Sequence, residues 1–416
     1  MSTPLITNDA VVLGLLCIIL AFVFITSSSK KPGWKKFYKY VPSLLLCYFI
    51  PSIFNSLGII SGDESNLYHV ASRYLLPASL VLLTLSIDFK GIINLGPKAI
   101  IMFLAGTVGI VIGGPLAIFA VSFIAPDVLG GSGPEEVWRG LATIAGSWIG
   151  GGANQTAMKE VFGASDNLFS AMIAVDVIMA NLWMAVLLYG AGISDKVDKW
   201  LKADNSAIVK LKDSIENYQL SNAKNPGLTQ LITIVAIGLG VTAIAHVGAD
   251  FLGPFFGENF PALDKFSFSS KFFWLIIIAT TLGLILSFTK LRSYEDYGAS
   301  KVGSLFLYVL VASIGMKMNL LAIQDSPGYF LIGLIWMLIH ITVLLTTAKI
   351  IKAPFFFTAV GSQANVGGAA SAPIVASAFH PALASVGVLL AVLGYALGTY
   401  AAYFCALLMQ AASAGV

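Results

Sequence analysis

The feature that most constrains this chain is a series of apolar stretches without charged residues, each about as long as a membrane is thick. The longest is residues 353–416, which contain no Lys, Arg, Asp or Glu. A helix of about 20 apolar residues crosses the roughly 30 Å hydrocarbon core of a bilayer. Only 11% of the 416 residues are charged, against about a quarter in an average soluble protein. We therefore expect an all-α polytopic membrane protein.

The apolar segments fall into two series separated by one long polar stretch. The first series is 10–29, 40–62, 74–87, 99–126, 140–158 and 167–194, and the second is 225–249, 272–289, 302–316, 326–348 and the tail from 353. This order predicts a first repeat over 1–194, a cytoplasmic linker over 195–228 and a second repeat over 229–416.

Two short motifs recur in matching places and support the repeat. Residues 86–90 (SIDFK) correspond to 313–317 (SIGMK). Residues 146–156 (GSWIGGGANQT) correspond to 361–371 (GSQANVGGAAS). Because glycine weakens a helix, each Gly-rich motif predicts a broken segment, over 140–165 in the first repeat and 353–380 in the second.

The distribution of basic residues predicts the orientation of the two repeats. The first loop carries Lys30, Lys31, Lys35, Lys36 and Lys39, which places it in the cytoplasm together with the linker. Five segments separate the two, so one of them enters and leaves on the same side. The Gly-rich segment is the best candidate, which gives five spans and one re-entrant segment per repeat and makes the repeats inverted. The acidic stretch 250–258 then falls in an outer loop. The alternative is that the broken segments cross the membrane as discontinuous helices.

Two breaks in matching positions of inverted halves predict a shared polar site near the membrane midplane. Amides at broken helix ends suit anionic groups, whereas freed carbonyls and side-chain oxygens suit a cation such as sodium. The alternative is that small residues only permit close helix packing, to which Asn and Gln would add nothing. The candidate binding residues around the breaks are Ser147, Gly150, Gly151, Gly152, Asn154, Gln155, Thr156, Ser362, Gln363, Asn365, Gly367, Gly368 and Ser371.

Asp176 is the one carboxylate deep in an apolar segment, with Asn181 following it. An ionised carboxylate there costs on the order of 3 kcal/mol unless it is paired, hydrated or protonated. Asp176 is therefore a candidate cation ligand or proton carrier, the alternative being a carboxyl hydrogen-bonded for helix packing. The matching helix of the second half offers Thr399 but no acid. A sodium site is a candidate near Asn154, Asp176 and Asn365.

Several other classes of protein are disfavoured. The net charge of +3 leaves no basic face for nucleic acid. Cys17, Cys47 and Cys405 lack zinc-site spacing and are expected to be small core residues. No metalloprotease motif occurs, and a single embedded acid does not make an aspartyl protease, so we expect no enzyme and no resident cofactor.

The motifs GSWIGGGANQTAM, DFK, LGPKAI and AVDVIMANLWM resemble the YjcL-like family of bacterial membrane proteins, a domain-of-unknown-function family (family 819), over nearly the whole chain. This family is similar to the cation-coupled transporters with inverted repeats and broken core helices. The resemblance implies a core domain that carries the breaks and slides as an elevator against a dimeric scaffold domain. The glycines 150–152 and 367–368 resemble the re-entrant motifs of citrate symporters. However, no Arg near the second break is placed to clamp a di- or tricarboxylate.

Together these features predict a secondary active transporter in the inner (cytoplasmic) membrane. The expected activity is sodium-coupled symport of a small polar or anionic solute, such as an amino acid, short peptide or carboxylate. The expected assembly is a homodimer formed through scaffold helices. Proton coupling or sodium/proton antiport is the alternative, and a channel or holin-like pore is a second one.

Overall fold

The architecture is that of a computed structural model, which describes residues 4–38, 41, 43–62, 64–204, 224–317, 327–380 and 383–415. Every regular element in these ranges is helical. Six helices are long and apolar enough to cross a membrane. They are α1 (Asp9–Ser27), α7 (Pro97–Ile124), α9 (Asp166–Gly192), α12 (Leu228–Asn259), α15 (Gly328–Ile350) and α18 (Ala384–Ala414). Residues 205–223 of the predicted linker, and Lys39, lie outside the described residues.

The other predicted spans coincide with shorter helices. These are α3 (Ser43–Ser56), α13 (Lys271–Ser287), α14 (Ala299–Gly315) and a continuous stretch made of α4 (Leu67–Val70), η1 (Ala71–Leu75) and α5 (Leu76–Leu85). Short helices complete the chain: α2 (Pro32–Tyr38), α6 (Phe89–Asn94), α10 (Ser194–Leu201), the 3₁₀ turns η2 (Pro126–Leu129), η3 (Gly133–Glu135) and η4 (Pro261–Phe266), and η5 (Lys290–Tyr297). The last of these bends by 93° from α13.

The first Gly-rich segment, α8 (Val137–Phe162), folds into a hairpin that we call hairpin 1. Gly151 breaks the helix because its φ of 76° and ψ of −175° belong to a region that is open almost only to glycine. The two ends of α8 therefore meet. Arg139 donates a hydrogen bond to the carbonyl of Phe162, and the rings of Trp138 and Phe162 lie 5.6 Å apart.

The second Gly-rich segment forms hairpin 2, from α16 (Phe355–Val366) and α17 (Gly368–Phe379). At its base the rings of Phe356 and Phe379 lie 5.4 Å apart. At its tip Gly368 has a positive φ of 58°, and Gln363 Nε2 donates to Ser371 Oγ across the turn at 2.7 Å.

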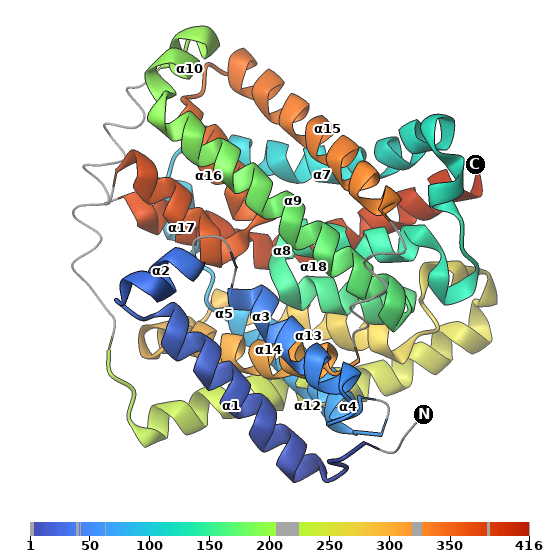
Figure 1. Cartoon of the computed structure of the whole chain (residues 1–416). Helices are drawn as coiled ribbons and strands as arrows, with labels where there is room; N and C mark the ends of the chain where they lie inside the picture. The colour runs from blue at the N-terminus through green and yellow to red at the C-terminus, as the bar shows by residue number, and fades with distance from the viewer. Residues whose placement is uncertain are drawn as a thin grey trace.

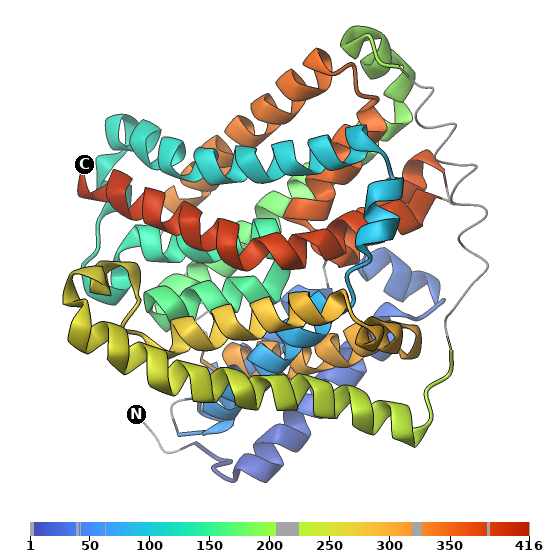
Figure 2. The same cartoon turned by 180° about the vertical axis from the view of Figure 1, so that it is seen from behind.

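The helices are arranged in two layers, one above the other in Figures 1 and 2. The hairpin layer consists of α7, α9, α15, α18 and both hairpins, and the support layer of α1, α3–α5 and α12–α14. Within the hairpin layer α18 crosses hairpin 1 closely. A Cβ atom placed on Gly150 would lie 2.6 Å from the Cα of Gly398, so this crossing requires both glycines.

Two expectations are wrong. The acidic stretch 250–258 is not a loop, because it forms the end of α12, which continues to Asn259, and Asp250 pairs from within it with Lys271 at 2.8 Å. Its position outside the membrane stays a prediction. Cys17 is not a core residue but is exposed on α1, whereas Cys47 and Cys405 are buried. The spacing of apolar and charged residues does not show which side of a uniformly apolar helix faces its neighbours.

Candidate functional site

The tips of both hairpins line one cavity, of about 310 Å³. Its hairpin-layer wall contains half of the sixteen predicted site residues. They are Ser147, Gly151, Gly152, Asp176, Asn181, Gln363, Gly367 and Ser371. The support layer closes the cavity from the other side with Tyr308 of α14, Ser27 of α1 and Ser43 of α3, and Tyr38 of the short helix α2 joins them. The cavity therefore lies between the layers.

Asp176 is the only charged residue in the described lining of this cavity. It is carried by α9, which begins at Asp166 because Ser165 caps it by accepting a hydrogen bond from the backbone N–H of Leu168. The Asp176 side chain is buried, with 6% of its surface exposed. Its position next to the break is what the sequence predicts.

Three hydrogen bonds from hairpin 1 hold the Asp176 carboxylate. Ser147 Oγ donates to Oδ2 at 2.6 Å, Gln155 Nε2 donates to Oδ2 at 3.0 Å, and Trp148 Nε1 donates to Oδ1 at 2.7 Å. An ionised carboxylate offers about four acceptor positions. These donors offset much of the cost of burying the charge, and among the described residues they leave one acceptor position on Oδ1 without a hydrogen-bond donor.

Gln363 of hairpin 2 lines the same cavity and carries a buried side-chain acceptor. Its Nε2 is bonded to Ser371, but Oε1 has no hydrogen-bond partner among the described residues. The side chain is only 1% exposed. A buried carbonyl oxygen without a partner costs about 1–3 kcal/mol, so Oε1 is a candidate acceptor for a ligand.

The remaining predicted residues lie behind the cavity wall and stabilise the breaks. Asn154 Nδ2 and Thr156 Oγ1 donate to the carbonyls of Gly150 and Gly152, on either side of the break at Gly151. Thr399 of α18 in turn donates to Asn154 Oδ1 at 2.5 Å. The polar residues after the first break thus bond to carbonyls on both sides of it, and Asn154 anchors the hairpin to α18.

Hairpin 2 is anchored in a similar way. Asn365 donates to the carbonyls of Gly361 and Phe103 and accepts from Thr107 Oγ1 of α7, at 2.8 Å. Of the three residues expected beside sodium, only Asp176 therefore lines the cavity. Gly368 supplies the positive φ at the tip and is not part of the lining.

Ser362 also belongs to this inner anchor. It accepts a hydrogen bond from Trp183 Nε1 of α9 at 2.7 Å, and its Oγ lies 2.8 Å from His340 Nε2. His340 Nδ1 lies 3.0 Å from the Gly106 carbonyl, so the imidazole joins α7, α15 and hairpin 2. The Ser362 hydroxyl is fully buried and points into packing rather than into the cavity.

Sequence reasoning missed Trp148 and the support-layer wall. Trp148 stands inside the GSWIGGGANQT motif, and an indole N–H in a Gly-rich turn could have been recognised as a donor for a buried acid. Tyr308 lies in a short apolar helix with no sequence signal that distinguishes it. Its place in the wall depends on how the two layers meet.

Paired hairpins whose tips meet at a buried carboxylate, in a bundle with six long apolar helices, define a multi-pass integral membrane protein with a central polar site. The chain belongs to the family described as "Protein of unknown function (DUF819)", whose profile matches residues 14–412. It is similar to the uncharacterized membrane protein YjcL of Bacillus subtilis (strain 168), with 24% identity over 361 residues that cover 85% of this chain and 86% of YjcL.

Proposed function

We propose that the protein is a secondary active transporter whose solute and coupling ion bind in the cavity between the hairpin tips. The observation that carries this proposal is the meeting of Gly151, Gly367 and Asp176 around one cavity. At 1.5 Å per residue, the 12 residues of α16 extend about 18 Å, which is well short of a bilayer core of about 30 Å. Hairpins of this length reach the middle of a membrane and return to the same side.

Inverted repeats are the arrangement that best accounts for the packing. In this arrangement α3 corresponds to α13, α5 to α14, α7 to α15 and α9 to α18. The contacts agree, because α5 packs on α13 as α14 packs on α3, and α7 packs on α18 as α15 packs on α9. The hairpin layer would be the moving element of an elevator and the support layer its scaffold.

The chemistry of the cavity favours a coupling cation and a neutral or zwitterionic solute. Asp176 carries its single formal charge, and the described lining contains no Lys or Arg that could neutralise a dicarboxylate. Hydroxyl and amide groups of Ser371, Gln363 and Asn181 offer hydrogen bonds to a polar solute. A sodium-coupled symporter for a small amino acid or short peptide fits this lining best.

The proposed assembly is a homodimer in the cytoplasmic membrane. Among the six long helices α12 has the smallest buried share. Its outer face exposes Ile232, Leu239, Ile244 and Val247. This support-layer face could contact a second copy without covering the cavity.

The test is whether sodium binding and sodium-driven solute uptake require Asp176. Purified protein should unfold at a higher temperature in NaCl than in equimolar choline chloride, because a ligand that binds only the folded state stabilises it. Asp176→Asn should lose this difference in melting temperature. Any amino acid or dipeptide that raises the wild-type melting temperature is then tested in proteoliposomes, and Asp176→Asn should lose its sodium-driven uptake. Asp250→Asn is the matched control, since Asp250 is exposed and pairs with Lys271 away from the cavity.

A sodium-dependent shift that survives Asp176→Asn would contradict the coupling role. If the melting temperature of the wild type depends on pH through Asp176 but not on sodium, the protein is a proton-coupled transporter. Unitary currents through the reconstituted protein would contradict the transporter and establish a channel.

A further inference from the structure

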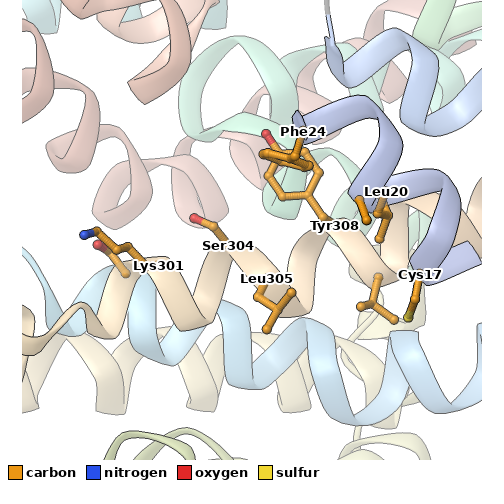
Figure 3. Close-up of a pocket in the computed structure, with 10 residues that line it drawn as sticks. Cys17, Leu20, Phe24, Lys301, Ser304, Leu305 and Tyr308 are labelled. Atoms are coloured by element: carbon orange, nitrogen blue, oxygen red, sulfur yellow. The ribbon is translucent and has the colours of Figure 1, made fainter. Parts of the chain in front are cut away.

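A second cavity, of about 520 Å³, opens on the outside of the support layer between α1 and α14. Figure 3 shows its course along α14, from Lys301 at one end past Ser304, Leu305 and Tyr308 towards Cys17. Its volume is in the range of about 300–1,000 Å³ that is typical of small-molecule sites. Apart from Lys301, every residue in its described lining is uncharged.

The length of this groove matches one leaflet of a bilayer. From Lys301 to Val309, the last lining residue on α14, the helix rises about 12 Å at 1.5 Å per residue. Half of the hydrocarbon core measures about 15 Å. The apolar walls, among them Leu20, Phe24 and Leu305, therefore extend from one interface towards the bilayer centre.

Charge marks the polar end of the groove. Lys301 is exposed, and among the described residues its ammonium group has no ion-pair partner. The nearby carboxylate of Glu295 is already held by Ser300, which donates from its backbone N–H at 2.8 Å and from Oγ at 2.6 Å. Lys301 therefore interacts with Glu295 only beyond ion-pair distance, and its exposed ammonium group can donate hydrogen bonds to an anion from outside the protein.

The basic residues that follow α1 predict which leaflet of the membrane the groove faces. The end of α1 that points towards Lys301 is followed by Lys30, Lys31, Lys35 and Lys36. Such basic loops lie on the cytoplasmic side, where the membrane surface is rich in anionic lipid.

We infer that the groove between α1 and α14 binds an anionic phospholipid of the cytoplasmic leaflet, with its headgroup on Lys301 and one acyl chain along Leu305 and Tyr308 towards Cys17. Tyr308 also lines the central cavity. A bound acyl chain therefore contacts a residue that also lines the polar site, so lipid composition can influence that site.

The inference is tested with photoactivatable lipids. The protein is reconstituted in vesicles of equal parts phosphatidylglycerol and phosphatidylcholine, with a diazirine on the acyl chain of one lipid or the other. Adducts are then located by peptide mass spectrometry. We expect groove peptides that contain Cys17 or Leu305 to carry about fivefold more phosphatidylglycerol than phosphatidylcholine adducts, the preference that one basic side chain near the membrane surface supplies. Lys301→Gln should remove this preference.

Two controls distinguish a site from bulk lipid. Lys290→Gln should keep the preference, because Lys290 is exposed on the same side but does not line the groove. Peptides around Val108 and Phe119, exposed on α7, should label equally with both lipids. Equal labelling of the groove as well would overturn the inference, as would a groove protected from lipid by a second copy of the chain.

Discussion

Two glutamines near the hairpin tips, Gln363 and Gln155, differ at the scale of one residue in how their amide groups are bonded. The Gln363 amide nitrogen is fixed by Ser371, while Oε1 is buried without a partner among the described residues. Gln155 is the opposite case, because its amide nitrogen donates to the buried Asp176 at 3.0 Å. The two glutamines should therefore respond differently to loss of the amide.

Gln363→Met should change the free energy of unfolding of the ligand-free protein by less than about 1 kcal/mol. It removes the unpaired Oε1 but also loses the hydrogen bond from Nε2 to Ser371 Oγ, at nearly constant volume. The same substitution should abolish stabilisation by solute. Gln155→Met should destabilise the ligand-free protein by about 1.5–3 kcal/mol, since it takes a donor from a buried carboxylate. Equal destabilisation by both substitutions in thermal unfolding would show that Gln363 is only structural.

Residue types near the breaks were predictable from the sequence, but their roles were not. Asn154, Asn365 and Gln363 all stand beside a glycine break, where a polar amide can serve the backbone or a ligand. The first two bind carbonyls and neighbouring helices, and only Gln363 lines the cavity. The choice depends on which helix face meets α18 or α7, and this is a property of tertiary packing.

The glycine-rich tips differ at the scale of the element. In hairpin 1 Gly151 has the backbone conformation that needs glycine, while Gly152 is helical. In hairpin 2 Gly368 takes the positive φ. At Gly367 a Cβ atom would lie 1.8 Å from Ser371 Oγ and 2.1 Å from Gln363 Nε2. The sequence predicted both breaks, but it could not show whether backbone angle or space requires a given glycine.

Gly151→Ala should destabilise the protein by about 1–3 kcal/mol, because alanine is strained in this backbone region although nothing obstructs its Cβ. Gly152→Ala is the adjacent control. Its Cβ would meet only Leu307, at 3.9 Å, and alanine favours a helix by about 0.5–1 kcal/mol over glycine. Thermal unfolding of both variants gives the comparison, and an equal effect would argue against a glycine-specific tip.

At the scale of the whole molecule, the two layers are joined by a cluster of charges at the base of hairpin 1. Arg73 of η1 pairs with Glu160 of hairpin 1 at 2.8 Å. The neighbouring Lys159 is bonded to Tyr68 of α4 at 3.0 Å and paired with Asp166 of α9 at 2.6 Å. The sequence places Lys159 and Glu160 at the end of an apolar segment, but it does not indicate partners about 90 residues away in the other layer.

If transport moves the hairpin layer against the support layer, the contact between Arg73 and Glu160 must open in each cycle. A double-mutant cycle with Arg73→Gln and Glu160→Gln should give a coupling energy of about 1 kcal/mol, because both side chains are partly exposed. Where this movement limits the rate, the double variant should take up solute about fivefold faster in proteoliposomes, since about 1 kcal/mol is removed from the barrier.

The control is the pair Lys98 and Asp204, which lie 3.0 Å apart at the α7 and α10 ends of the hairpin layer and whose loss should not change the rate. A faster rate in the control variant, or no coupling between Arg73 and Glu160, would show that the charge cluster does not restrain movement of the layers.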